Sequence, residues 1–512
     1  MMDRITDAMD DRFVSEKLAA AREYETKNEI AANDRPLFHV TPAVGWMNDP
    51  NGFSVYAGRV HLFYQYHPYS TVWGPMHWGH QVTKDMIKWE QLPAALAPDT
   101  EYDEDGCFSG TAIEDKGRHI LIYTSVMKNP DGEGVLQNQS IAVGDGTEYT
   151  KIGGNPVVNG DMLPYGLSRE DFRDPKVWQE DGIYYMVAGT VDEDKKGQVV
   201  LFSSQDLVNW SFESVLAKND KDYGGVWECP DFFEIDGHKV LLVSPIEMVA
   251  KGYEFHNGNN SIYFIGDYDD TEKKFEVGEP FSLDYGTDFY APQTTLLPDG
   301  RRVMIAWMQS WHNLWIPQGQ MWQGMMTLPR EISLKDGRLI QRPVREIENY
   351  RSDKVILANE LVSGSCVFDG ISGRFIDMEI AVKGDGYNEF AIDLAKNDRY
   401  YTRFTYDRRK NIIELDRTFA GFERDVVCIR RAEVKPSYSA DSQRGSAEDV
   451  GSIDEQIKLR FILDRNSIEL FVNDGIMTMS TAIYTPVTAT GIEFSCDGKA
   501  VVDIEKYDIK MN

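Results

Sequence analysis

GRVHLFYQY at residues 58–66 shows the pattern that decides the fold of this chain, a turn glycine followed by an apolar run rich in β-branched and aromatic residues. The pattern recurs as GRHILIYT (117–124), GIYYMVAGT (182–190), GHKVLLVS (237–244) and GRRVMIAWM (300–308). Successive turn glycines are 55–65 residues apart, which leaves room for four short strands and their loops. Five such units predict a five-bladed β-propeller.

The sequence changes character on both sides of this repeat. Beyond about residue 345 the repeat stops, and the stretch IKLRFILD (457–464) alternates apolar and polar residues before the turn Asn473-Asp474-Gly475, which predicts an antiparallel β-sandwich. The polar stretch 434–455 predicts a long exposed loop. The charged N-terminus predicts a helix, with Ser15 as a candidate cap.

The predicted fold class is therefore all-β, a five-bladed β-propeller followed by a β-sandwich, with a short N-terminal helical extension. The expected boundaries are 1–35 for the helical extension, 36–345 for the propeller, 346–365 for a linker and 366–512 for the sandwich.

Bulk composition limits the partners and the compartment. The formal net charge of -30 repels phosphate backbones and anionic lipid, so we expect neither a nucleic acid nor a membrane partner. No run of 18 apolar residues is present, and the charged N-terminus does not have the apolar segment of a secretory signal. Five cysteines without a C-x-x-C pair suit a reducing compartment. We therefore expect a cytoplasmic protein.

Three carboxylates precede turn glycines at nearly the same distance. Asp49 lies 9 residues before Gly58, Asp174 lies 8 before Gly182, and Glu228 lies 9 residues before its own turn glycine. The innermost strand of each propeller blade lines the central channel, so residues at one phase of the repeat converge. The spacing predicts that these three side chains occupy equivalent positions in three blades and meet in one cavity.

Paired carboxyl groups beside aromatic residues indicate glycoside cleavage, which needs one group to donate a proton and another to attack or to activate water. Asn48 and Asn51 are candidate donors that would keep Asp49 ionised. Glu228 stands between an aromatic and a sulfur-containing residue, so we expect a more desolvated carboxyl that suits the acid. Aromatic platforms around carboxylates favour a neutral sugar.

At these residues the chain resembles glycoside hydrolase family 32, the β-fructofuranosidase group that includes invertases, inulinases, levanases and sucrose-6-phosphate hydrolases. The resemblance covers the chain from about residue 36 onward. Its motifs occur in the expected order: WMNDPNG (46–52), FYQY (63–66), WGPMHWGH (73–80), FSG (108–110), RDP (173–175), ECP (228–230) and SIELFVNDG (467–475).

The resemblance implies a role for each carboxylate. Asp49 would attack the anomeric carbon and form a fructosyl-enzyme, Glu228 would act as acid and then base, and Asp174 would bind fructose hydroxyls and stabilise the transition state. It also implies substrate-binding roles for Asn48, Gln65, Trp73, Phe108, Ser109 and Arg173. No metal and no cofactor are expected.

The leading hypothesis is retaining hydrolysis of sucrose and short fructo-oligosaccharides. Sucrose-6-phosphate hydrolysis is the nearest alternative, and exo-acting inulinase or levanase activity and fructosyl transfer follow. A non-catalytic fructan-binding propeller would not need both Asp49 and Glu228. An inverting enzyme would separate its carboxyl groups by about 6.5–9.5 Å, against about 5–5.5 Å for a retaining one. Whether the sandwich packs on the propeller, forms a homo-oligomer contact or extends a subsite stays open.

Overall fold

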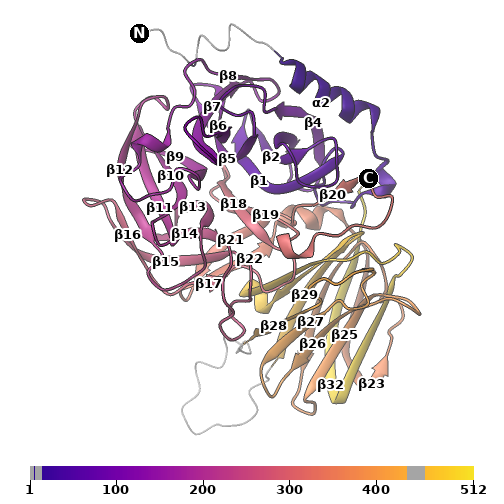
Figure 1. Cartoon of the computed structure of the whole chain (residues 1–512). Helices are drawn as coiled ribbons and strands as arrows, with labels where there is room; N and C mark the ends of the chain where they lie inside the picture. The colour runs from indigo at the N-terminus through magenta and orange to yellow at the C-terminus, as the bar shows by residue number, and fades with distance from the viewer. Residues whose placement is uncertain (1–4, 6–13, 435–455, 512) are drawn as a thin grey trace.

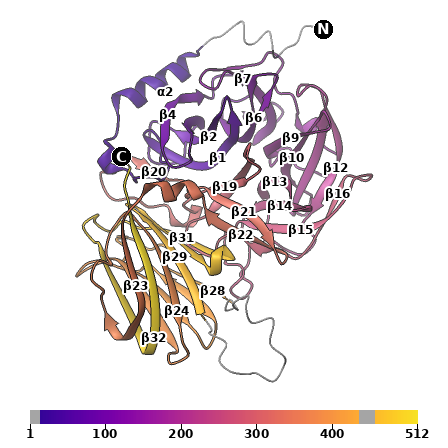
Figure 2. The ribbon, with the colours of Figure 1, turned by 180° about the vertical axis from the view of Figure 1, so that it is seen from behind.

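The computed structural model describes residue 5, residues 14–434 and residues 456–511. Figure 1 shows a ring of small sheets, indigo to salmon, above a stack of long strands, orange to yellow. Figure 2 gives the same arrangement from behind, with the helix α2 on the outer side of the ring. The predicted all-β class, with a five-bladed propeller followed by a sandwich, is confirmed.

Five antiparallel sheets form the propeller. The first contains β1 (Gly45–Tyr56), β2 (Arg59–His67), β3 (His77–Thr83) and β4 (Trp89–Leu96), and the second β5 (Gly106–Asp115), β6 (Arg118–Lys128), β7 (Val135–Gly144) and β8 (Tyr149–Lys151). The third contains β9 (Arg173–Glu180), β10 (Ile183–Val191), β11 (Gly197–Ser204) and β12 (Trp210–Lys218). The fourth contains β13 (Trp227–Ile235), β14 (His238–Pro245), β15 (Ile262–Asp269), β16 (Lys274–Val277) and β17 (Phe281–Ser282). The fifth contains β18 (Tyr290–Leu296), β19 (Arg302–Trp307), β21 (Arg330–Lys335) and β22 (Arg338–Pro343).

The innermost strands β1, β5, β9, β13 and β18 surround the centre of the ring. Each contacts the next, and β18 returns to β1, so the ring is closed. The short strand β20 (Trp322–Gln323) pairs in parallel with β1 and ties the last blade to the first. Residues on the inner strands of different blades therefore lie within reach of one another.

Hairpin turns explain why the repeat was visible in the sequence. In the turns Ala57-Gly58, Lys116-Gly117, Asp181-Gly182 and Asp236-Gly237 the first residue has φ of 48–51° and the glycine φ of 72–80°. Two successive positive φ values define the type I′ turn, whose twist matches that of the flanking strands. Glycine adopts this conformation without steric cost, so it marks the turn between the first two strands of a blade.

The described part of the sandwich contains ten strands: β23 (Arg351–Cys366), β24 (Ile376–Lys383), β25 (Glu389–Lys396), β26 (Thr402–Asp407), β27 (Ile412–Asp416), β28 (Ile429–Glu433), β29 (Gln456–Asp464), β30 (Ser467–Val472), β31 (Met477–Ala482) and β32 (Gly491–Ile509). The first part of β32 pairs with β25 and the second part with β24, so the two layers diverge from this one long strand.

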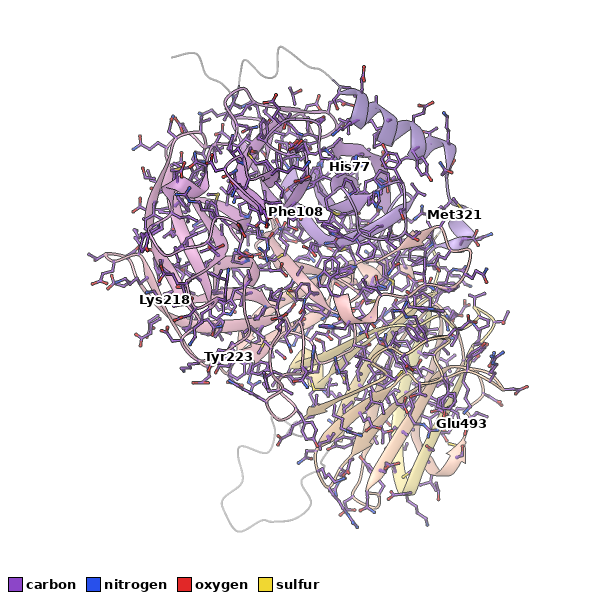
Figure 3. The ribbon with its side chains drawn as sticks, in the orientation of Figure 1. His77, Phe108, Lys218, Tyr223, Met321 and Glu493 are labelled. Carbon is purple, nitrogen blue, oxygen red and sulfur yellow. The ribbon has the colours of Figure 1, made fainter. Side chains whose placement is uncertain are left out.

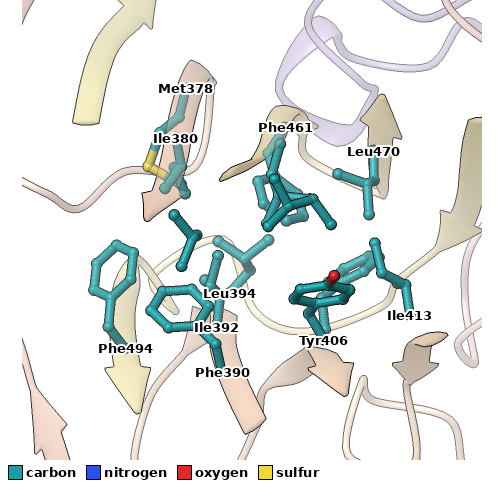
Figure 4. Packing of buried hydrophobic residues seen from close by; sticks show 14 of the residues in the cluster. Met378, Ile380, Phe390, Ile392, Leu394, Tyr406, Ile413, Phe461, Leu470 and Phe494 are labelled. Atoms are coloured by element: carbon teal, nitrogen blue, oxygen red, sulfur yellow. The ribbon is translucent and has the colours of Figure 1, made fainter. Parts of the chain in front are cut away.

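The two layers bury a shared apolar core, seen in Figure 4. Phe404 of β26 packs edge-to-face on Phe461 of β29, with ring centroids 5.1 Å apart. Ile457, Leu459, Phe461 and Leu463 are all buried, as their alternation predicted.

The N-terminal helix α2 (Glu16–Lys27) begins at the predicted cap, because the Ser15 hydroxyl accepts a hydrogen bond from the backbone N–H of Leu18. It covers the outer strand of the first blade: Leu18 and Ala21 are buried, and Arg22 Nε donates to the backbone oxygen of Ala94 at 2.9 Å. A short 3₁₀ turn, η1 (Ala32–Asp34), follows before the propeller begins. The described residues contain four more 3₁₀ turns: η2 (Gly160–Met162), η3 (Trp311–Asn313), η4 (Arg345–Tyr350) and η6 (Asn473–Gly475).

The stretch expected as a linker, 346–365, is not one. It contains most of η4 and then nearly all of β23, which pairs along its length with β32. Three bulges interrupt that pairing, so the two-residue alternation that identifies a strand is lost. The loop expected over 434–455 lies almost entirely outside the described residues. Among the described helices, none is long and apolar enough to cross a membrane.

Candidate active site

Three carboxylates from separate inner strands meet at one end of the central channel. Asp49 lies on β1, Asp174 on β9 and Glu228 on β13. The Cys229 sulfur is 3.8 Å from Oδ2 of Asp49 and 3.7 Å from Oδ2 of Asp174. The Arg173 Nε lies 3.1 Å from Oε1 of Glu228 and 4.0 Å from Oδ2 of Asp174. These contacts bring the three acidic side chains into one cluster.

A backbone bulge interrupts each of three inner strands close to this cluster. In β9, β13 and β18 two residues stand opposite one residue of the neighbouring strand. The first residue of each bulge, Asp174, Cys229 or Ala291, has φ of 64°, 49° or 51°, and a proline follows each. Such left-handed conformations cost roughly 1–3 kcal/mol each and persist only where the surrounding structure enforces them.

The positions of the bulges also show whether the carboxylates occupy equivalent places in their blades. Asp174 and Cys229 occupy the same position in their blades, whereas Glu228 precedes its bulge by one residue. The prediction that Asp174 and Glu228 are equivalent is therefore wrong by one residue. The two carboxylates reach the cluster from neighbouring positions of their strands.

Two hydrogen-bond donors hold Asp49. The Ser109 hydroxyl donates to Oδ2 at 2.7 Å, and the Asn48 side chain also bonds the carboxylate. The indole N–H of Trp46 donates to Oδ1 of Asn48 at 2.7 Å, which leaves the Asn48 amide to face Asp49. Burial raises the pKa of Asp49, the negative charge of Glu228 raises it further, and the two donors oppose this rise. Asn51, the other expected donor, bonds its neighbours instead: its amide oxygen accepts from the backbone N–H of Gln65 at 3.0 Å and from the Gln65 side chain at 2.9 Å, and its amide nitrogen donates to the backbone oxygen of Pro50 at 3.2 Å.

The Glu228 carboxylate lies in a polar, partly exposed environment, contrary to the expectation of a more desolvated carboxyl. Arg173 donates to Oε1 from Nε at 3.1 Å and from Nη2 at 3.0 Å, and the Tyr290 hydroxyl donates to Oε2 at 2.5 Å. The side chain is 21% exposed. The preceding residue, Trp227, points away and packs on Phe264 inside the blade. Successive side chains of a strand point to opposite faces of the sheet, so the residues next to Glu228 in the sequence do not indicate what surrounds its carboxylate.

Asp174 is the most enclosed of the three carboxylates. Its Oδ2 accepts the backbone N–H of Cys229 at 2.9 Å, and its own N–H donates to Thr124 Oγ1 at 2.9 Å. Burial raises the pKa of Asp174, Arg173 lowers it, and the other two carboxylates raise it. Burial and the adjacent carboxylates also hold the pKa of the Cys229 thiol well above its usual range, so this thiol is neutral.

Of the predicted substrate-binding residues, Asn48, Ser109 and Arg173 contact the carboxylates directly. Phe108 lies near the centre of the ring in Figure 3, and Trp73, 47% exposed, meets it edge-to-face with centroids 5.9 Å apart. Gln65 is buried and donates to the backbone oxygen of Cys107 at 3.0 Å, so it supports β5 rather than the carboxylates.

Sequence reasoning missed Tyr290 and Cys229, which contact the carboxylates, and Trp311, which stacks on Trp46. Tyr290 directly precedes a proline-containing bulge and Cys229 is the first residue of another, and these positions in the repeat motif are the signal that identifies them. Trp311 stacks on Trp46 with centroids 5.8 Å apart and an interplanar angle of 27°. It lies on η3, in a long connection outside the repeat, so no sequence signal marks it.

Comparisons with known proteins agree with this geometry. The model of the glycosyl hydrolases family 32 N-terminal domain matches residues 39–343, and that of the family 32 C-terminal domain matches residues 344–510. A sucrose-6-phosphate hydrolase of Escherichia coli is 36% identical over 88% of this chain and 89% of its own length. A raffinose invertase of Escherichia coli is 36% identical over 91% of this chain and 93% of its own.

A solved structure gives the same result. A variant of a Bombyx mori family 32 β-fructofuranosidase in complex with sucrose superimposes with a TM-score of 0.80. The two chains are 33% identical, and the match covers 97% of this chain and 99% of the Bombyx mori chain. The chain described here therefore belongs to glycosyl hydrolase family 32.

Proposed function

We propose that this glycoside hydrolase is a retaining β-fructofuranosidase that releases terminal β-D-fructofuranosyl groups from sucrose and short fructo-oligosaccharides through a covalent fructosyl-enzyme. The observation that carries the proposal is the cluster of Asp49, Asp174 and Glu228, in which each carboxylate has different hydrogen-bond partners. Different surroundings allow one carboxyl to carry a proton while its neighbour stays ionised.

Asp49 is the proposed nucleophile. Its Oδ1 is buried without a partner in the described structure, while Ser109 holds the other oxygen. In the first step an Asp49 oxygen bonds the anomeric carbon, the bond to the leaving oxygen breaks, and its electron pair stays with that oxygen. Glu228, held by Arg173 and Tyr290, gives the leaving oxygen a proton.

In the second step Glu228 takes a proton from water, the water oxygen bonds the anomeric carbon, and the Asp49 carboxylate leaves. Asp174 is the proposed stabiliser of the intervening oxocarbenium-like state and the acceptor for fructose hydroxyls. Asn48, Gln65, Trp73, Phe108, Ser109 and Arg173 are the proposed lining of the fructose subsite.

The charges around the site support a neutral sugar. In each blade the innermost strand begins at the end of the propeller where the carboxylates lie, and the second strand returns to that end. The loop between the second and third strands therefore lies at the same end as the carboxylates. Lysines occur among them at 195, 196 and 251. Lys195 pairs with Asp171, Lys196 pairs with Asp222, and Lys251 lies 4.0 Å from the Tyr223 ring centroid. Phosphate recognition needs convergent cations, and these are already engaged.

Hydrolysis of sucrose 6-phosphate is the second candidate, because relatives with that name are 36% identical to this chain. Initial rates on sucrose, sucrose 6-phosphate, 1-kestose and inulin, measured side by side, separate these functions through kcat/KM. We expect sucrose to be preferred over its phosphate. A preference of about a hundredfold for the phosphorylated sugar would overturn the main assignment.

We further propose a cytoplasmic location, supported by the absence of any disulfide among the five cysteines. The proposed domain division is an N-terminal helical extension to residue 35, a catalytic propeller from 36 to 343, a short junction at 344–350 and a sandwich from 351. It follows the ends of β22 and η4 and the start of β23.

A further inference from the structure

A closed ring of hydrogen bonds joins the β27–β28 connection of the sandwich to the fifth blade. Arg417 Nε donates to the backbone oxygen of Val427 at 2.8 Å, and the Val427 N–H donates to Oδ1 of Asn313 at 2.9 Å. Asn313 Nδ2 donates to the backbone oxygen of Thr287 at 2.8 Å, and the Thr287 hydroxyl donates to Oδ2 of Asp288 at 2.8 Å. The ion pair between Arg417 and the same oxygen of Asp288 closes the ring.

The residues that form these hydrogen bonds are shielded from water. Arg417, Asp288 and Asn313 are 0%, 1% and 2% exposed. Phe422, also in the β27–β28 connection, packs under the guanidinium, which lies 4.5 Å from its ring centroid. The Phe422 side chain also packs against Trp315 of the propeller, with ring centroids 5.4 Å apart. The contact is therefore a packed joint rather than a surface ion pair.

Both propeller segments in the joint lead directly into the active site. Asp288 stands two residues before Tyr290, whose hydroxyl donates to Glu228 at 2.5 Å. Asn313 is the last residue of η3, whose first residue, Trp311, stacks on Trp46. The joint thus holds the segment that leads to Tyr290 and the proposed acid, and the 3₁₀ turn that contains Trp311.

We propose that Arg417 of the sandwich is a positioning residue for the leaving-group side of the active site, acting through Asp288 and Tyr290 on Glu228. The inference rests on the proposed function. It gives the sandwich a part in catalysis: the sandwich sets the geometry of the acid, while the Ser109 donor of Asp49 lies on the second blade and has no contact with the joint in the described structure.

A pair of substrates tests this division. Sucrose has a poor leaving group that needs the proton from Glu228, whereas p-nitrophenyl β-D-fructofuranoside releases a phenolate that leaves without one. kcat/KM reports the steps up to departure of the leaving group. A displaced acid therefore slows sucrose cleavage selectively, and general loss of folded protein slows both substrates equally.

We expect Arg417→Gln to lower kcat/KM for sucrose by about tenfold or more and for the aryl fructoside by less than about threefold. Arg417→Lys, which keeps the charge, should restore part of the loss on sucrose. The matched control is Lys354→Gln, which removes a cation that pairs with Glu505 between β23 and β32, strands that β25 and β26 separate from β27 in the sheet. This control should leave both substrates unchanged.

Phe422→Ala keeps the experiment decisive if Arg417→Gln does not fold, because it loosens the joint without leaving a buried charge unpaired. We expect the same selective loss on sucrose, of smaller size. Equal losses on both substrates, or no loss on either, would overturn the inference. Wild-type protein that cleaves neither substrate would instead refute the proposed function, so the two failures are distinguishable.

Discussion

The Ser109 hydroxyl donates a 2.7 Å hydrogen bond to Oδ2 of Asp49, across the boundary between the second blade and the first. Burial and the charge of Glu228 both raise the pKa of Asp49. A hydrogen bond from a hydroxyl stabilises the charged carboxylate, so Ser109 opposes that rise. This contact keeps Asp49 available as a nucleophile at lower pH than its burial alone would allow.

Ser109→Ala should therefore weaken catalysis most in acid. A hydrogen bond to a charged group contributes about 1.5–3 kcal/mol, so we expect kcat/KM for sucrose to fall by roughly tenfold or more. The low-pH limb of the pH–rate profile should move to higher pH, because Asp49 then ionises later. Ser109→Thr retains the hydroxyl and should shift the limb less. An unshifted limb in the alanine variant would remove this role from Ser109.

Asp49→Asn tests the nucleophile directly. The amide is nearly isosteric but cannot form the fructosyl-enzyme, so we expect kcat to fall by about 10³-fold or more. The thermal unfolding midpoint should stay close to that of the wild type, because the asparagine fills the same space beside Ser109. Turnover near the wild-type rate, with unfolding unchanged, would assign the attack to another group.

The anomeric outcome tests the covalent intermediate. Two displacements at the same carbon restore the starting configuration, whereas one displacement inverts it. With methanol as acceptor we expect methyl β-D-fructofuranoside, identified by NMR as the first-formed glycoside. This product does not mutarotate, so its configuration records the chemistry of the enzyme. Formation of the α-anomer would rule out Asp49 as a covalent nucleophile.

Local signals in the sequence were enough to predict the ring of blades. A type I′ turn needs a residue such as Gly58 at positive φ, and an alternating strand such as β29 needs an apolar face, so both leave a pattern within a few residues. The strand β23 left no such pattern. It pairs only with β32 among the described strands, its three bulges break the alternation, and most of its side chains are exposed.

The site was predictable to within one residue of phase. Asp49, Asp174 and Glu228 could be found because the innermost strands share a phase. The bulges that place Cys229 rather than Glu228 opposite Asp174 depend on pairing between strands, which spacing alone does not reveal. Trp311 could not be predicted from the sequence for a different reason, because contacts with the distant sandwich position its 3₁₀ turn.

A second joint between the domains contains a histidine that lies between two carboxylates. His39, in the segment before β1, bonds Oδ2 of Asp464 through Nδ1 at 2.8 Å and Oε1 of Glu469 through Nε2 at 2.9 Å. All three side chains are buried. Burial alone would lower the pKa of His39, but the hydrogen bonds and charges of the two carboxylates outweigh it and raise the pKa to about 9. Arg330 pairs with the other oxygen of Glu469, so the joint is ionic throughout.

This histidine should make stability fall in mild alkali. A pKa raised from its unfolded value of about 6.5 contributes stability that is complete below pH 6.5 and is lost as the pH rises through about 9. At about 1.4 kcal/mol per pKa unit the contribution is on the order of 3 kcal/mol. We expect the urea midpoint of the wild type to drop between pH 6.5 and pH 9 more steeply than that of His39→Gln, which is less stable at pH 6.5 but has no titrating group at this position. The difference between the two proteins isolates His39 from other groups that titrate in this range. Parallel curves would show that the imidazole is neutral in the folded protein.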